Sequence, residues 1–129
     1  MAEESQTPPV ARSILNTIKK ALGLDPSYDV FDTDIVMHIN STFATLNKLG
    51  VGPEEGFSIE DDSATWQDFL GLVETNKLLS VKSYMYLKVR LLFDPPTTSF
   101  AIDAMKKNAE EYEWRLNVQT DKPRSIPTT

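Results

Sequence analysis

The sequence predicts an all-α fold, a small bundle of four to five helices with a short extended loop and an extended C-terminal arm. Three observations lead to this prediction. The chain has 129 residues, a length typical of one domain. Apolar residues recur at spacings of three and four along most of it, and Gly or Pro follows each such stretch. Hydrophobic residues make up 40% and charged residues 25%, so the chain can bury a core without disulfides or metals.

The first predicted helix begins at Thr7 and ends before Gly23. Thr7 is a suitable N-cap and Pro8 suits the first helical position. One stripe at spacing four follows: Val10, Ile14, Ile18 and Leu22. Gly23 is typical of a C-terminal glycine cap. The polar residues 1–6 before this helix are expected to form a flexible lead.

The second predicted helix has Asp32 as its N-cap and ends at Gly50. Phe31 and Val36 stand at the two ends of a hydrophobic staple. The apolar stripe is Ile35, Ile39, Phe43, Leu46 and Leu49.

Residues 51–62 break regular structure with two glycines and a proline, and they form the most acidic stretch of the chain. Within them, residues 57–59 alternate in hydropathy and predict a short strand or an extended loop. Ser63 is expected to cap a third helix that contains Trp66, Phe69, Leu70 and Val73. We expect this helix to end near Asn76 and Lys77.

From Leu78 to Phe93 the chain is apolar on nearly every side. Such a helix belongs at the centre of a bundle. At about 1.5 Å per residue it is near 24 Å long, too short to cross a membrane. Asp94, Pro95 and Pro96 end it.

The last predicted helix begins at Thr98 or Ser99. Its heptad-like seam is Ile102, Met105, Ala109, Tyr112 and Leu116. After Val118 the chain turns polar with two prolines, which indicates an extended arm. We therefore expect a lead at 1–6, a helical domain at 7–118 and a C-terminal arm at 119–129.

Composition excludes several classes of function. The chain has no cysteine and one histidine, so thiolate metal sites, cysteine nucleophiles and histidine-based zinc sites are not expected. The formal net charge of −6 argues against duplex DNA as a tightly held ligand. The acidic N-terminus is unlike a secretory signal, so we expect a cytosolic protein, with no membrane contact.

The sequence predicts no catalytic residue, no metal site and no cofactor. The glycine pair at residues 50–52 is followed by proline and two glutamates, which does not fit a phosphate-binding loop. The acidic residues 60–62 lack the oxygen pattern of a calcium loop. His38 has no second ligand, which favours a packing or surface role.

The residues that suggest contacts with other proteins are aromatic or basic. Trp66 and Trp114 are each either a core anchor or an interface hot spot. Lys82, Lys88 and Arg90 interrupt the apolar helix. Their stems either reach solvent, or their charges meet acidic groups within the fold or on an adjacent subunit.

The order and spacing of several short motifs resemble the small helical head–tail connector (adaptor) proteins of long-tailed double-stranded DNA phages. The resemblance covers about residues 10–118. The run from Lys88 to Pro96 is its most specific part. The remaining motifs are residues 22–24, 31–35, 39–40, 59–61, 65–69, 81–84, 99–101 and 113–117.

This resemblance implies a non-enzymatic virion protein at the head–tail interface, present in the host cytoplasm during assembly. It implies a ring, usually of twelve subunits, that lies beneath the portal protein and offers a platform to a stopper or tail-completion protein. DNA would pass through the channel without sequence-specific binding. Independently of the resemblance, the net charge of −6 predicts an acidic channel that repels DNA. The expected interface residues are Trp66, Lys82, Lys88, Arg90, Trp114, Arg115, Lys122, Arg124 and Ile126.

Three other functions remain open at this point. One is a helical interaction module unrelated to phage, such as a chaperone or regulatory adaptor. The others are a small enzyme that uses paired carboxylates and a helical DNA-binding regulator, which the acidic charge disfavours.

Overall fold

The computed structural model describes residues 12–71 and 75–118, which contain five helices and no strand. The all-α prediction is therefore confirmed. The helices are α2 (Ile14–Ala21), α3 (Asp32–Lys48), α4 (Trp66–Leu70), α5 (Thr75–Phe93) and α6 (Ser99–Val118).

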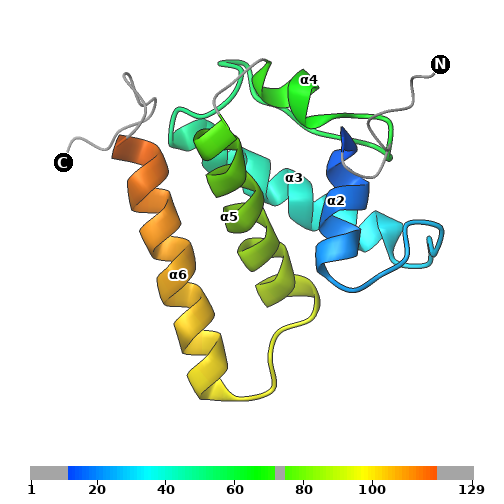
Figure 1. Ribbon diagram of the computed structural model, residues 1–129, viewed down its shortest axis with the longest axis vertical. Helices are drawn as coiled ribbons and strands as arrows, with labels where there is room; N and C mark the ends of the chain where they lie inside the picture. Colours follow the sequence, from blue (N-terminus) through cyan, green and yellow to red (C-terminus); the bar gives the residue numbers. More distant parts are fainter. Residues whose placement is uncertain (1–11, 72–74, 119–129) are drawn as a thin grey trace.

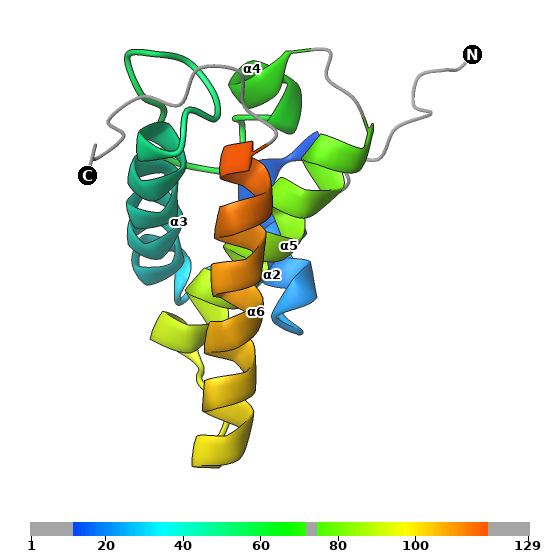
Figure 2. The same cartoon turned by 90° about the vertical axis from the view of Figure 1, so that its left-hand side faces the viewer.

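The apolar helix α5 lies at the centre and contacts α2, α3 and α6 (Figure 1). The side chains of Val81, Tyr84, Met85 and Val89 are fully buried, which confirms the predicted central position. Helices α5 and α6 form an antiparallel hairpin, while α3 and α2 lie on different sides of α5 (Figure 2). The end of α6 that begins at Ser99 projects beyond the rest of the molecule in both views.

Helix α2 begins at Ile14, so the predicted continuous helix from Thr7 is wrong at Ser13. Ser13 has an extended backbone with ψ of 130°, and its hydroxyl accepts a hydrogen bond from the backbone N–H of Asn16 at 3.1 Å. The N–H of Ile14 instead donates to the carbonyl of Ala64 at 3.0 Å. Thr7 itself lies outside the described residues. The predicted glycine end is confirmed, because Gly23 has φ of 87°.

Helix α3 has Phe31 rather than Asp32 at its N-cap position, and no side chain caps it. The predicted cap is wrong because the Asp32 carboxylate pairs with the ammonium group of Lys19 at 2.8 Å. Lys19 is 1% exposed and also donates to the carbonyl of Pro26 at 2.8 Å. The end at Gly50 is as predicted, with φ of 87°.

Helix α4 is capped by Thr65, not by Ser63. Thr65 and Asp68 form a capping box, in which each side chain accepts the other residue's backbone N–H. Ser63 instead donates its N–H and hydroxyl to Asp61, at 2.9 and 2.6 Å. Residues 57–59 form an extended loop rather than a strand.

Helix α5 continues through Asn76 and Lys77, so the predicted break there is wrong. The third predicted helix already ends at Leu70, and Val73 falls outside the described residues. Helix α6 is capped by the Thr98 hydroxyl, which accepts from the N–H of Ala101 at 3.1 Å. This confirms one of the two predicted caps.

The predicted seam of α6 faces the core. Ala109 and Leu116 are buried, and Met105 and Tyr112 pack against the core while partly exposed. The predicted arm at 119–129 and most of the predicted lead lie outside the described residues, so the three-part division stays a proposal. No helix in the described ranges is long and apolar enough to cross a membrane.

Candidate interaction surface

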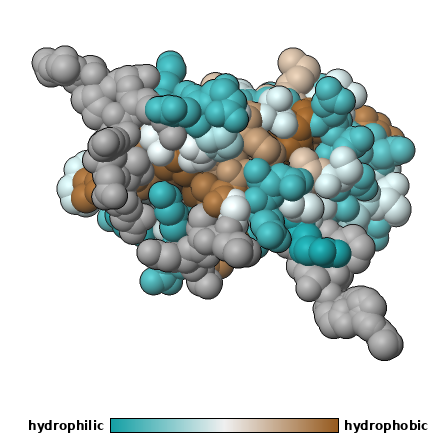
Figure 3. All heavy atoms as spheres, turned by 90° about the horizontal axis from the view of Figure 1, so that it is seen from above, coloured by the Kyte–Doolittle hydropathy of each residue, from teal (hydrophilic) through white to brown (hydrophobic). Residues whose placement is uncertain are grey.

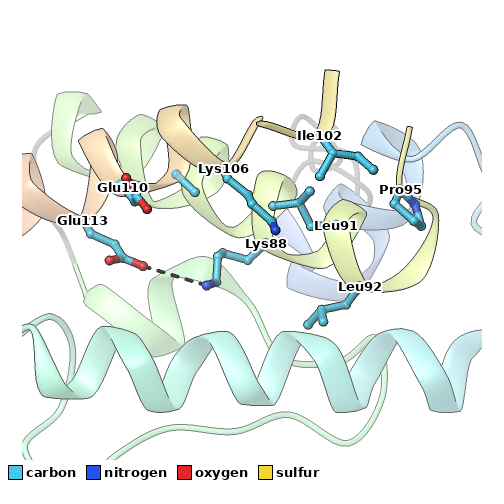
Figure 4. A pocket seen from close by; sticks show the side chains of 9 residues that line it. Lys88, Leu91, Leu92, Pro95, Ile102, Lys106, Glu110 and Glu113 are labelled. Atoms are coloured by element: carbon cyan, nitrogen blue, oxygen red, sulfur yellow. Dashed lines mark ion pairs between the residues drawn. The ribbon is translucent and has the colours of Figure 1, made fainter. Parts of the chain in front are cut away.

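A groove of about 600 Å³ lies between the C-terminal part of α5 and α6 (Figure 4). Its apolar side chains gather at the Ser99 end of α6, and its charged side chains lie towards the other end (Figure 4). The lining residues are Lys88, Leu91, Leu92, Pro95, Ile102, Lys106, Ala109, Glu110 and Glu113. A mixed groove of this kind suits a protein segment with both apolar and charged side chains.

A partly buried network of side chains holds one side of this groove. The Tyr84 hydroxyl donates to Oε2 of Glu113 at 2.6 Å, and Nζ of Lys88 lies 3.9 Å from the same oxygen. Burial raises the pKa of Tyr84, and the hydrogen bond to Glu113 raises it further. Glu113 therefore ties α6 to α5, and Lys88 meets its acidic partner within the fold.

The remaining basic candidates have neutral or local partners. Arg90 donates from Nε to the carbonyl of Asp94 at 2.7 Å and from Nη1 to the Tyr86 hydroxyl at 3.0 Å. These bonds secure the C-terminal end of α5 without an acidic side chain. Arg115 lies 3.8 Å from Glu111 on the same helix, as its spacing predicts.

The two tryptophans differ in burial, and only Trp66 packs in the core of the subunit. Trp66 is 4% exposed and donates its ring N–H to the Thr17 hydroxyl at 3.1 Å. Lys82 lies over this ring, with its ammonium group 5.6 Å from the ring centroid. Trp114 is 67% exposed, so it is not a core anchor of the subunit. Lys122, Arg124 and Ile126 lie outside the described residues.

An aromatic cluster beside the hairpin was missed by the sequence reasoning. Phe31, from the turn before α3, packs edge-on against Phe93 at the end of α5, with ring centroids 5.3 Å apart. Tyr28 contacts Phe31 in the same way at 6.0 Å. Val30, which is 66% exposed, belongs to the same turn. Contacts between aromatic side chains of distant segments leave no periodic pattern in the sequence. The sequence therefore showed only that residues 28–31 contain two aromatic side chains.

The acidic loop lies at the opposite end of the molecule from the α5–α6 connection (Figure 1). Glu54, Glu55, Glu60 and Asp62 are exposed there. Hydrogen bonds from Ser63 lower the pKa of Asp61. In the view from above, hydrophilic residues border apolar atoms that cross the middle of this end (Figure 3). No three acidic, histidine or cysteine residues in the described ranges are grouped to hold a metal ion.

Comparison with known protein families gives a match that spans most of the chain. A family model described as phage connector protein matches residues 14–123. No curated protein and no solved structure matches the chain. The matched span covers all the helices described above.

Proposed function

This chain belongs to the phage connector protein family, and from that premise we propose that it is a structural adaptor subunit that forms a ring beneath the portal. The family is structural. It gives the chain a head–tail connector role, in the virion and in contact with other virion proteins. The finer proposal adds a closed ring, usually of twelve copies, that docks on the portal protein and presents a platform to the stopper or tail-completion protein. Subunits would be present in the host cytoplasm during assembly.

The family match over residues 14–123 is the observation that carries this proposal. It also favours a phage function over the other functions left open by the sequence, including an unrelated interaction module. The proposed role is non-enzymatic and needs no cofactor.

The projecting α5–α6 hairpin supports the ring. A closed ring needs two different complementary surfaces on each subunit, because its contacts run head to tail. The groove between α5 and α6 provides one surface with apolar and charged parts. Leu92, at 55%, is the most exposed of the large hydrophobic side chains that line the groove. We propose that Lys88 and Arg90 shape this surface by holding Glu113 and the end of α5.

The charge of the subunit supports passage of DNA without binding. The formal net charge is −6, and five acidic residues lie in the loop from Glu54 to Asp62. Repeated around a channel, such charge would repel the phosphate backbone and prevent tight contacts. A basic lumen in the assembled ring would contradict this part of the proposal.

The ring is tested by electron microscopy of the purified protein mixed with the portal of its phage. The wild-type chain should give closed rings on the portal. Leu92→Glu should abolish them, because it places a charge in the apolar part of the groove. Met37→Glu is the matched control, since Met37 is 63% exposed on α3 and outside the groove.

Circular dichroism should show both variants folded. Rings that persist in Leu92→Glu would remove the groove from the subunit contact. Absence of any ring with the wild-type chain would contradict the proposed function itself.

A further inference from the structure

The outward face of α6 carries a second stripe, directly opposite the buried seam. Successive members are four, three, four, three and four positions apart, so at about 100° per residue they share one narrow face. Exposure reaches 84% at Phe100, 67% at Trp114 and 59% at Val118. A solvent-facing stripe on a bundle helix is normally polar. The stripe consists of Phe100, Ala104, Lys107, Glu111, Trp114 and Val118.

The stripe is complementary to itself when it is reversed. If two copies of α6 run antiparallel on their outward faces and cross at the level of Ala109 along the helix axis, Phe100 of one lies opposite Val118 of the other. Ala104 then lies opposite Trp114, which matches the smallest side chain of the stripe with the largest. Lys107 lies opposite Glu111, which matches opposite charges. Two-fold symmetry repeats each match, so all six positions are paired.

The surface around Ala104 is hollowed in the manner this pairing requires. A depression of about 510 Å³ is lined by residues that flank Ala104 on the outer side of α6, including Phe100 and Lys107. The indole of Trp114 from a second copy would enter this depression. Buried tryptophans in such hollows commonly contribute much of the binding energy of an interface.

The charges select the antiparallel direction. A parallel pair in register would bring Lys107 against Lys107 and Glu111 against Glu111. Like charges at these positions disfavour the contact, whereas the antiparallel pair joins opposite charges twice. Glu111 also pairs with Arg115 on its own helix at 3.8 Å, at the edge of the stripe.

We propose that the outward face of α6 binds a second copy of this chain as an antiparallel, two-fold symmetric dimer. This goes beyond the proposed ring, whose contacts are head to tail, and it concerns the protein before it meets the portal. The stripe spans about 27 Å of helix, so the dimer buries less than the roughly 1,200 Å² of a stable interface. We therefore expect a reversible dimer with a dissociation constant on the order of 10 μM.

Sedimentation equilibrium of the full chain without portal measures this dimer. Lys107→Glu should raise the dissociation constant at least about tenfold, since it places two like-charge pairs in the contact. The double variant Lys107→Glu/Glu111→Lys should restore the dimer. Lys20→Glu is the matched control, because it makes the same change in net charge at an exposed position of α2. This helix lies behind α5 as seen from α6 (Figure 2). The control variant should leave the dissociation constant unchanged.

The direction is tested by disulfide formation, because the chain has no cysteine of its own. Phe100→Cys and Val118→Cys chains should cross-link only when they are mixed, since each position meets the other in the antiparallel pair. A disulfide in Phe100→Cys alone would show a parallel pair and overturn the proposal.

A wild-type chain that remains monomeric at all concentrations would also overturn the dimer. If that monomer still forms rings on the portal, only the dimer fails and the proposed function stands. Failure of the double variant to restore association, with its helicity intact, would refute the Lys107–Glu111 match. These outcomes separate the dimer from the ring.

Discussion

Replacement of Asp32 by Asn should lower the free energy of unfolding by about 2 kcal/mol, because it removes the charged partner of a buried lysine. Lys19 is 1% exposed, and its ammonium group lies 2.8 Å from Asp32 and 2.8 Å from the Pro26 carbonyl oxygen. Breaking a buried ion pair on one side costs roughly 3–5 kcal/mol. The Asp32 side chain is 33% exposed, and solvent screening reduces that figure.

The matched variants separate the pair from other effects. Lys19→Met removes the buried charge and keeps the apolar stem, so its cost should stay near 1 kcal/mol. The double variant Lys19→Met/Asp32→Asn should be about as stable as Lys19→Met alone. Asp34→Asn changes the same helix end at an exposed position, and it should cost only about 0.5 kcal/mol through the helix dipole.

Urea unfolding followed by circular dichroism provides these free energies. The reasoning would be refuted if Asp32→Asn cost no more than Asp34→Asn. It would also be refuted if the effects of Lys19→Met and Asp32→Asn simply added, because the two residues would then not interact.

Three further changes test the packing of the core and the caps. Because the pKa of Tyr84 is raised, the folded state keeps the phenol proton above about pH 10, where the unfolded chain releases it, and wild-type stability falls as pH rises. Tyr84→Phe should make this fall smaller, as urea unfolding at several pH values would show. Gly52→Ala should lower the free energy of unfolding by about 3 kcal/mol, since its φ is 93° and a Cβ there would overlap the Phe69 ring. Gly56→Ala is the control, because a Cβ there meets open space, and it should cost about 1 kcal/mol. Equal losses of the two variants in thermal unfolding would contradict this reasoning. Thr65→Ala should cost about 1 kcal/mol by removing the cap of α4, and unchanged urea unfolding would exclude that role.

Much of the architecture could be predicted because the sequence carries clear helix-terminating residues. Gly23, Gly50 and the Asp94–Pro96 run end their helices where expected. The apolar character of α5 on nearly every side predicted its central position, because such a helix needs several packing partners, which are α2, α3 and α6.

The errors arose where a residue's partner comes from elsewhere in the chain. Ser13 interrupts a periodic apolar stripe because the Ala64 carbonyl takes the hydrogen bond of Ile14. Asp32 has the composition of a cap, but the buried ammonium of Lys19 takes its carboxylate. The Thr65 cap was different, since Asp68 three residues later completes a capping box that the sequence itself shows.

The candidate surface was only partly predictable for the same reason. The sequence showed that Lys82, Lys88 and Arg90 are unusual on an apolar helix, but it did not show their partners. These partners, which are Trp66, Glu113 and the Asp94 carbonyl in that order, depend on how the chain packs around α5. Trp114 is two positions from each of the seam residues Tyr112 and Leu116, which puts it on the opposite side of α6, facing solvent.

The mass of the complex formed by the wild-type chain and its portal tests the central claim most directly. Native mass measurement should show the portal gaining one closed set of subunits, about twelve copies of a 14.5 kDa chain, with no partly filled species at saturation. A portal whose mass is unchanged by excess chain, or which takes up scattered copies without closure, would contradict the account.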